Sequence, residues 1–271
     1  MSVTYGNAPL IEIVAELRWA QGASPMIGAG SSGPVLMLPF GQPSSEQFLA
    51  SFSNEVAADG FIRSERLVPM GMQAAPGQPS VRFRRDGSGS PSMLQAGPSF
   101  FSANSVPPYE SWKAFSPEVG RGVKALLRSR PDSERDLAFN GLNLRYINAF
   151  GPSHLDGRPI PAFIRDVLGF EAGFPPAMAG RIQRDSVPDA FLQFSIAIDE
   201  STRLQGSVGQ AVVNGTLSAL LDLTAVHIGE VAPKEDEVMR VFDRARDLIH
   251  ETFVEMTRPI HPLMKPIGSS T

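Results

Sequence analysis

Cysteine is absent from this sequence of 271 residues. Its absence excludes a disulfide framework, thiolate-bound zinc and a catalytic thiol, and it fits a reducing compartment. The chain also lacks an N-terminal basic segment followed by an apolar run, and Glu12, Glu16 and Arg18 interrupt its first apolar stretch. The sequence therefore predicts neither a signal peptide nor a membrane span. We expect a cytoplasmic protein that is long enough to bury a core without metals or crosslinks.

An excess of positive charge is also lacking. The chain has 24 Lys and Arg residues against 28 Asp and Glu residues, a net charge of −4, and no basic run. This balance does not favour nucleic acid as a partner. The densest basic group is Arg82, Arg84 and Arg85 on an expected strand, where Arg82 and Arg84 point to one face and Arg85 to the other. A solvated strand face explains this group better than a nucleic-acid site does.

Glycine and proline, in contrast, are abundant, with 25 and 24 residues, and they gather in loops at 22–43, 71–79, 87–91 and 151–161. Hydrophobic periodicity between these loops predicts the order strand, helix, three strands, helix and strand for the first half. The expected elements are 11–19, 43–60, 63–69, 80–85, 93–101, 109–128 and 141–150.

The second half predicts a short helix at 161–168, strands at 177–187, 190–199 and 215–229, and a turn at 199–209. The last element is the clearest, because apolar residues recur at helical spacing from Val238 to Met256. Runs of strands with helices beside them indicate an α+β fold with an antiparallel sheet, helices packed on one face and a long C-terminal helix. We expect either two similar α+β halves, 1–150 and 151–271, or one continuous domain, since no residue-level repeat supports a duplication.

Three stretches are similar to one protein family: Asn7 to Trp19 (NAPLIEIVAELRW), Leu144 to Asn148 (LRYIN) and Leu248 to Thr257 (LIHETFVEMT). In this order they resemble a sporadically distributed family of uncharacterised bacterial and archaeal proteins. Members often carry a histidine about one turn before the position of His250, but this chain has Ala245 and Arg246 there. The resemblance therefore implies no paired-histidine role. The scattered occurrence of the family implies horizontally moved gene clusters, among them toxin–antitoxin and phage-defence systems, and this is an association rather than a mechanism.

No motif in the sequence predicts a cofactor, a metal site or a catalytic group. Gly28 to Gly33 matches the three-glycine dinucleotide pattern, but no strand precedes it and no helix follows, so we expect a surface loop. The histidines His154, His227, His250 and His261 show no metal-ligand spacing, and we expect His227 and His250 to be hydrogen-bonded structural residues. No serine sits in a nucleophile-elbow motif, so the sequence leans away from an enzyme.

Polar and aromatic residues on the two strands that carry the resemblance, and near the end of the chain, are the candidate binding residues. Arg18 and Arg145 lie on outer strand faces, where they form either a partner surface or ordinary cross-strand pairs. Trp19 is either an interface residue or core. Asp222, which lies among leucines, needs an arginine partner or a polar pocket. The full set of candidates is Arg18, Trp19, Arg145, Asn148, Asp222 and His250.

Two functional hypotheses remain open from the sequence alone. The leading one is a non-enzymatic component that binds a partner protein encoded nearby, as the antitoxin, sensor or scaffold of an accessory or defence gene cluster; a homo-oligomer is also open. The alternative is a small-molecule-binding or catalytic pocket between the sheet and the C-terminal helix, where α+β folds often leave a concave apolar cavity.

Overall fold

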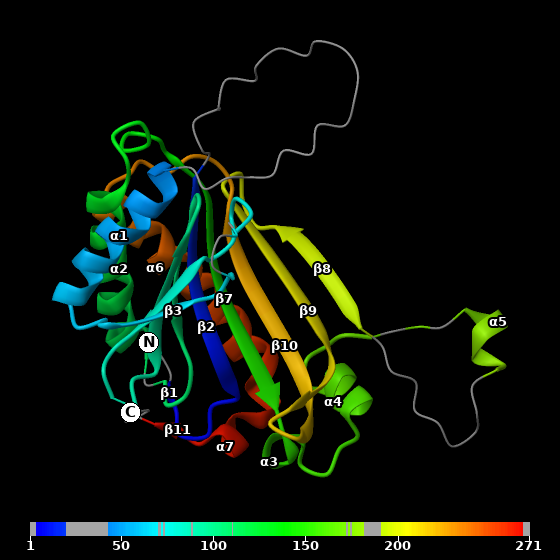
Figure 1. The fold of residues 1–271 in the computed structure, drawn as a ribbon. Coiled ribbons are helices and arrows are strands. Elements are labelled where there is room, and N and C mark those ends of the chain that lie inside the picture. The colour runs from blue at the N-terminus through cyan, green and yellow to red at the C-terminus, as the bar shows by residue number, and fades with distance from the viewer. Residues whose placement is uncertain are drawn as a thin grey trace. The chain divides into compact units, whose positions relative to one another are not determined.

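The structure is a computed structural model that describes residues 4–19, 43–69, 72, 74–87, 89–109, 111–171, 173, 175–181 and 191–267. It has the α+β architecture that the sequence predicts, with a nine-stranded antiparallel sheet and a long C-terminal helix (Figure 1). The strand order in the sheet is β3-β4-β5-β6-β2-β7-β10-β9-β8. No helix within the described part of the chain combines the length and the apolar composition that crossing a bilayer requires.

The chain divides into two compact units, each built from segments that are far apart in the sequence. One unit comprises Val14–Leu144 and His227–Arg244, and the other comprises Met1–Ile13, Arg145–Val226 and Ala245–Thr271. The sequence had suggested a division near residue 150. Interleaved segments of this kind leave no composition signal at a boundary, because β2, β7 and the last helix each contribute residues to both units.

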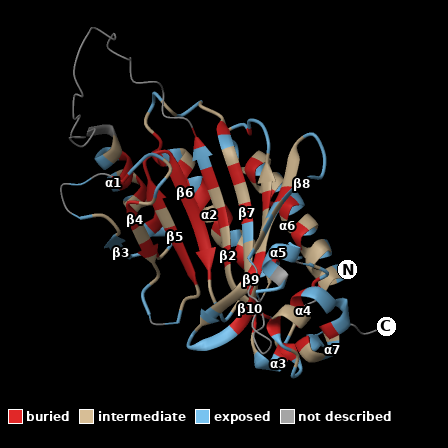
Figure 2. Ribbon diagram, turned by 90° about the vertical axis from the view of Figure 1, so that its right-hand side faces the viewer, coloured by how far each residue is buried: buried red, intermediate tan, exposed pale blue. Residues whose placement is uncertain are grey.

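The unit that contains Val14–Leu144 packs two helices on one face of a strand meander. These elements are α1 (Pro43–Ala58), β3 (Arg63–Arg66), β4 (Val81–Arg84), β5 (Ser92–Gly97), β6 (Phe100–Ser105) and α2 (Trp112–Ser129). The apolar stripe of α1 buries Phe48, Phe52 and Val56, as its spacing predicts. Figure 2 shows β5 and β6 buried along nearly their whole length. The helices α1 and α2 lie side by side over β4, β5 and β6 (Figure 1).

The register within this meander determines which side chains face the helices. Phe83 on β4 pairs with Leu94 on β5, which pairs with Ala103 on β6. A Cβ atom placed on Gly122 of α2 would lie 3.0 Å from Leu94 Cδ2, so this row faces α2. Because side chains alternate along a strand, the residues two positions away on each strand share that face.

The other unit contains two long strands, β9 and β10, together with shorter strand segments and several helices. They are β8 (Leu192–Ala197), β9 (Thr202–Val213), β10 (Thr216–His227), the second part of β7 (Phe139–Phe150) and the second part of α6 (Glu235–Thr257), with α3 (Pro152–Leu155), α4 (Ile160–Asp166) and α5 (Pro176–Ala179). Phe253 of α6 stacks on Phe150 of β7, with ring centroids 6.3 Å apart. The chain ends dock as well: β1 (Thr4–Tyr5) pairs with β11 (Pro266–Ile267), after α7 (His261–Met264).

Three expected elements differ in the structure, and the reasons are local. The predicted strand 93–101 is a hairpin, because Pro98 and Ser99 form a turn in which Ser99 has a φ of 55°. The predicted turn 199–209 belongs mostly to β9. In the predicted strand 177–187, residues up to Ala179 are helical, and 182–190 lie outside the described residues. The Gly28 to Gly33 loop also lies outside them.

Candidate functional sites

Arg18, the first predicted binding residue, lies on the exposed face of β2 (Leu10–Trp19) and makes local contacts. Its Nε donates to Glu16 Oε1 at 2.7 Å, and the same oxygen accepts from Asn143 Nδ2 at 3.3 Å. These are contacts between neighbours on a solvated sheet surface, and exposed ion pairs of this kind contribute about 1 kcal/mol or less. The ion pair of Arg18 lies within β2, and the cross-strand contact is the one between Glu16 and Asn143 of β7.

Trp19 belongs to the core, where it is 3% exposed. Its Nε1 donates to Glu134 at 2.6 Å, and the guanidinium of Arg130 lies 5.2 Å from its ring centroid. Arg130 is itself 2% exposed, lies 5.0 Å from the Phe139 ring and donates to Leu137 O at 2.9 Å. Burial lowers the pKa of Arg130 to about 10, although the nearby carboxylates of Glu134 and Asp136 act to raise it. The structure therefore gives Trp19 a packing role.

Arg145 and Asp222 contact each other. Arg145 Nε donates to both carboxylate oxygens of Asp222, at 2.9 and 3.0 Å, and the side chain of Asp222 is 14% exposed. Asp222 was predicted to need an arginine partner or a polar pocket, and Arg145 is that partner. On the opposite face of β7, Asn148 is buried and donates to Leu221 O at 3.5 Å. Both contacts link β7 to β10 within one unit and have a structural role.

His250 lies half-buried on α6, and its Nε2 has no hydrogen-bond partner among the described residues. Burial and the neighbouring Arg246 lower the pKa of His250, although Asp247 and Glu251 act to raise it. The expected structural hydrogen bond is therefore not seen at this atom. The described residues contain no group of three or more His, Asp or Glu side chains that could hold a metal ion.

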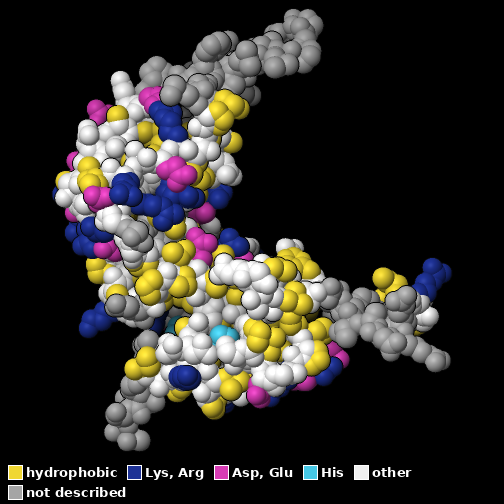
Figure 3. Space-filling view, turned by 60° about the horizontal axis from the view of Figure 1, so that its bottom comes forward, with side chains coloured by type: hydrophobic (Ala, Val, Ile, Leu, Met, Phe, Trp, Pro, Cys, Tyr) yellow, Lys and Arg dark blue, Asp and Glu magenta, His cyan; other side chains and the backbone are white. Residues whose placement is uncertain are grey.

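Arg82 of β4 and Arg85, which directly follows this strand, lie on opposite faces of the sheet, as the strand alternation predicts. Arg82 donates to Glu65 of β3 at 3.3 Å on the outer face, whereas Arg85 reaches Glu118 of α2 on the helix-covered face. On the face that Figure 3 presents, basic and acidic side chains lie beside one another and form no large patch of one sign. On that face, the distribution is unlike the basic surface of a nucleic-acid-binding protein.

A polar pocket lies where the first turns of α2 meet the ends of β4, β5 and β6. Its volume is about 270 Å³, and its lining includes Arg85, Ser92, Ser105, Tyr109, Phe115 and Glu118. Ser92 pairs directly with Ser105, and the β4–β5 register continues to place Arg85 beside Ser92. The three residues therefore form one row across three strands. This row lies two positions beyond the apolar row of Phe83, on the face that α2 covers.

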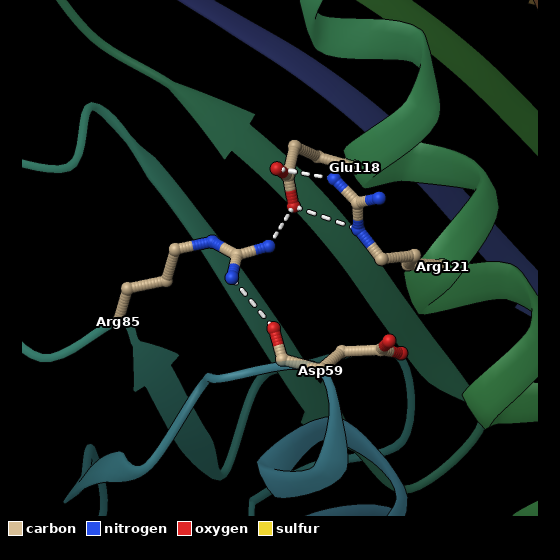
Figure 4. Close-up of polar contacts among 4 residues, drawn as sticks. All are labelled: Asp59, Arg85, Glu118 and Arg121. Atoms are coloured by element: carbon tan, nitrogen blue, oxygen red, sulfur yellow. Dashed lines mark hydrogen bonds and ion pairs between the residues drawn. The ribbon is translucent and has the colours of Figure 1, made fainter.

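Arg85 is held in the pocket by three neighbours. Its Nη2 donates to Glu118 Oε2 at 2.7 Å and its Nη1 donates to Asp59 O at 2.6 Å (Figure 4). Its guanidinium also lies 4.5 Å from the Phe61 ring centroid. Arg121 also binds Glu118, through Nε at 3.3 Å and Nη2 at 2.5 Å. Burial raises the pKa of Glu118, but the hydrogen bonds from Arg121 and Arg85 outweigh it and hold this pKa below its ordinary value.

The charged residues that line the pocket are Arg85 and Glu118. Arg121 binds Glu118 from outside this lining, and the carboxylate of Asp59 offsets the charge of Arg121. Arg121 takes both oxygens of Glu118, and Arg85 uses two of its five N–H donors. Sequence reasoning placed Arg85 on the correct face but did not predict the pocket, because β5 and β6 were interpreted as one strand and the Ser92–Ser105 pair exists only in the hairpin.

The two edge strands of the sheet differ in charge. At one edge, β3 (RSER) is charged and exposed: Arg63, Glu65 and Arg66 form ion pairs with Asp86, Arg82 and Glu46, respectively. At the other edge, β8 and its flanks (191–198, FLQFSIAI) contain no charged residue. Phe191, Ile196 and Ile198 there are 63%, 51% and 45% exposed, and β9 is the one described strand that pairs with β8.

None of the protein-family models, curated proteins or solved structures with which the chain was compared matches it.

Proposed function

We propose that this protein is a non-enzymatic interaction component that binds an extended segment of a partner protein along the edge of β8 that no described strand covers. The observation that carries this proposal is the uncharged, apolar edge strand. An edge strand presents a row of unpaired backbone N–H and C=O groups, and proteins usually protect such a row with charges, proline, bulges or a covering segment. The strand β3 carries these charges, and β8 has none.

The chemistry of β8 favours strand addition by a partner. Main-chain hydrogen bonds would provide affinity, and the exposed side chains of Phe191, Ile196 and Ile198 would provide apolar contacts with alternate residues of the added strand. Two rigid copies that meet edge to edge would touch mainly along β8, which is short for an interface of about 800 Å² per partner. A flexible segment can pair with the edge and also cover the flanking side chains, so we assign the site to a partner protein.

The biological role within this proposal rests on the family resemblance. A partner protein encoded nearby, in an accessory or defence-type gene cluster of a bacterial cytoplasm, fits an interaction component that acts as antitoxin, sensor or scaffold. The polar pocket does not bear on the competing hypothesis of a pocket between the sheet and the C-terminal helix, since its lining includes no residue of α6.

The test is co-expression of the protein with the products of its neighbouring genes, followed by native mass spectrometry. We expect a stoichiometric complex with one of these products. The variant Ile196→Lys adds a charge to the β8 edge and should abolish the complex while leaving the circular dichroism spectrum unchanged, because Ile196 is 51% exposed. The matched control is Ile62→Lys, beside β3, where an isoleucine of similar exposure, 59%, receives the same charge.

The outcomes separate the alternatives. A complex that Ile196→Lys removes and Ile62→Lys retains supports the proposal. A homodimer that Ile196→Lys dissociates would assign the edge to a second copy of the chain instead. A protein that stays monomeric with every neighbouring product, or a complex that both variants retain, would overturn the proposed use of β8.

A further inference from the structure

The pocket beneath the first turns of α2 has features that the interaction proposal does not explain. Ser105 is 2% exposed and Ser92 is 7% exposed, so both are buried serines. Their side chains share the face that α2 covers, and both line the pocket. Neither hydroxyl makes a hydrogen bond with a described residue. Neither hydroxyl oxygen is among the buried side-chain atoms that lack a partner, so both hydroxyls face the open space of the pocket, where a ligand can meet them.

The hydrogen-bond donors that face this space indicate which kind of ligand it favours. Arg85 keeps N–H donors beyond those given to Glu118 and Asp59, and Arg121 compensates the Glu118 carboxylate. The N-terminus of α2, a helix of 18 residues, adds the positive end of its dipole, and its first turn contains no acidic residue. A guanidinium, two hydroxyl donors and a helix N-terminus together favour an anion.

The rest of the lining limits the size and character of the ligand. The volume of about 270 Å³ exceeds that of an isolated anionic group, and Pro91, Pro108 and Phe115 provide apolar surface. A ligand that fills the pocket therefore combines an anionic head with a short apolar body. Because the pocket is small and opens to solvent, we expect weak binding, with a dissociation constant of roughly a millimole per litre.

We propose that this pocket binds a small anionic ligand whose carboxylate or phosphate group contacts Arg85 and the hydroxyls of Ser92 and Ser105. The ligand contacts residues of α2 and of β4–β6, and none of β8. Loss of partner binding at β8 and loss of ligand binding in this pocket are therefore separate observations, and each proposal can fail without the other.

The experiment is amide NMR of the full chain, titrated separately with inorganic phosphate, benzoate and benzamide. Benzamide has the shape of benzoate without its charge. We expect phosphate and benzoate to shift the amide signals of Ser92, Ser105 and Phe115 in a saturable way, whereas benzamide should not. A pocket that discriminates in this way recognises the charge of its ligand, and comparison of phosphate with benzoate distinguishes the two anionic groups.

Three variants test the residues. Arg85→Gln removes the guanidinium, and Ser105→Val removes a hydroxyl and fills its space with a residue that strands accept, so it tests the site even if Arg85→Gln destabilises the fold. Both should weaken benzoate binding by about tenfold or more. The control is Arg84→Gln, one residue away and on the opposite face, which should bind as the unmodified protein does.

Several results would overturn the proposal. These are the absence of saturable shifts with both anions, binding of benzamide as tight as that of benzoate, unchanged binding in Ser105→Val, or an equal loss in Arg84→Gln and Arg85→Gln. Saturable, charge-dependent shifts that Ser105→Val and Arg85→Gln weaken, and that Arg84→Gln keeps, would establish the site.

Discussion

His250 shows how a single buried nitrogen can make the stability of this protein depend on pH. Its Nε2 is buried without a partner among the described residues, and burial together with Arg246 lowers its pKa. The unfolded chain has the ordinary pKa of about 6.5. At a pH between the folded and unfolded values the unfolded state binds more protons, so the free energy of unfolding rises with pH there. The stabilising contribution is complete above pH 6.5 and is lost as the pH falls through the folded pKa.

We therefore expect mild acid to destabilise the protein through His250. Urea unfolding midpoints at pH 7.5 and 5.5 should differ in the unmodified protein and differ less in His250→Gln, whose side chain does not titrate. The carboxylate of Glu118 does not interfere, because its lowered pKa places its own contribution at a more acidic pH. An equal pH dependence in both proteins would mean that His250 is solvated enough to titrate normally.

At the same scale, the environment of a residue was easier to predict than its partner. The leucines around Asp222 predicted a charge partner for its carboxylate, and the structure supplies Arg145. Strand alternation alone left Arg18 and Arg145 as equal candidates, because the choice depends on which strands are neighbours. The aromatic ring of Trp19 gave no sign of Arg130, since the 111-residue separation between them closes only in the folded chain.

Within the helix α2, two glycines two residues apart have opposite surroundings. A Cβ atom on Gly122 would lie 2.5 Å from Phe101 Cζ, whereas one on Gly120 would meet only Glu235 Oε1, at 3.5 Å. Alanine is the better helix former by up to about 1 kcal/mol, but overpacking a core costs about 1 to 3 kcal/mol. We expect Gly122→Ala to lower the free energy of unfolding and Gly120→Ala to raise it.

Chemical denaturation of both variants checks this prediction, with Gly120→Ala as the matched control for helix propensity. If Gly122→Ala were as stable as Gly120→Ala, then Phe101 must move without cost, and the close packing of α2 on β6 would not limit this helix. The apolar stripe of α2 predicted this helix although its middle contains Pro117 and both glycines.

The strand β9 was missed although the sequence contains a signal for it. Asn214 and Gly215 have φ values of 50° and 77°, the conformation of a two-residue type I′ hairpin turn, for which Asn-Gly is the preferred pair. Two long strands are expected on either side of such a turn. The glycines at 206 and 209 were instead interpreted as loop residues. Gly206 is needed inside β9, since a Cβ there would lie 2.5 Å from the Phe194 ring.

For the whole molecule, periodicity predicted the fold class but not the functional surfaces. Helix and strand patterns depend on neighbours in the sequence, and most of them were correct. To predict the polar pocket, one would need the register of three strands and the position of the helix above them, and both are features of the tertiary structure. The β8 edge requires the strand order of the complete sheet. The uncharged segment 191–198 was visible in the sequence, but its position at an edge was not.

The unequal charge of β3 and β8 also limits how far this sheet can grow. A sheet with two unprotected edges can add strands at both and extend without end, as in a fibril. Here one edge is closed by ion-paired arginines, so growth can proceed from the other edge alone. Under the proposed use of β8, each molecule therefore offers one edge and binds one partner strand.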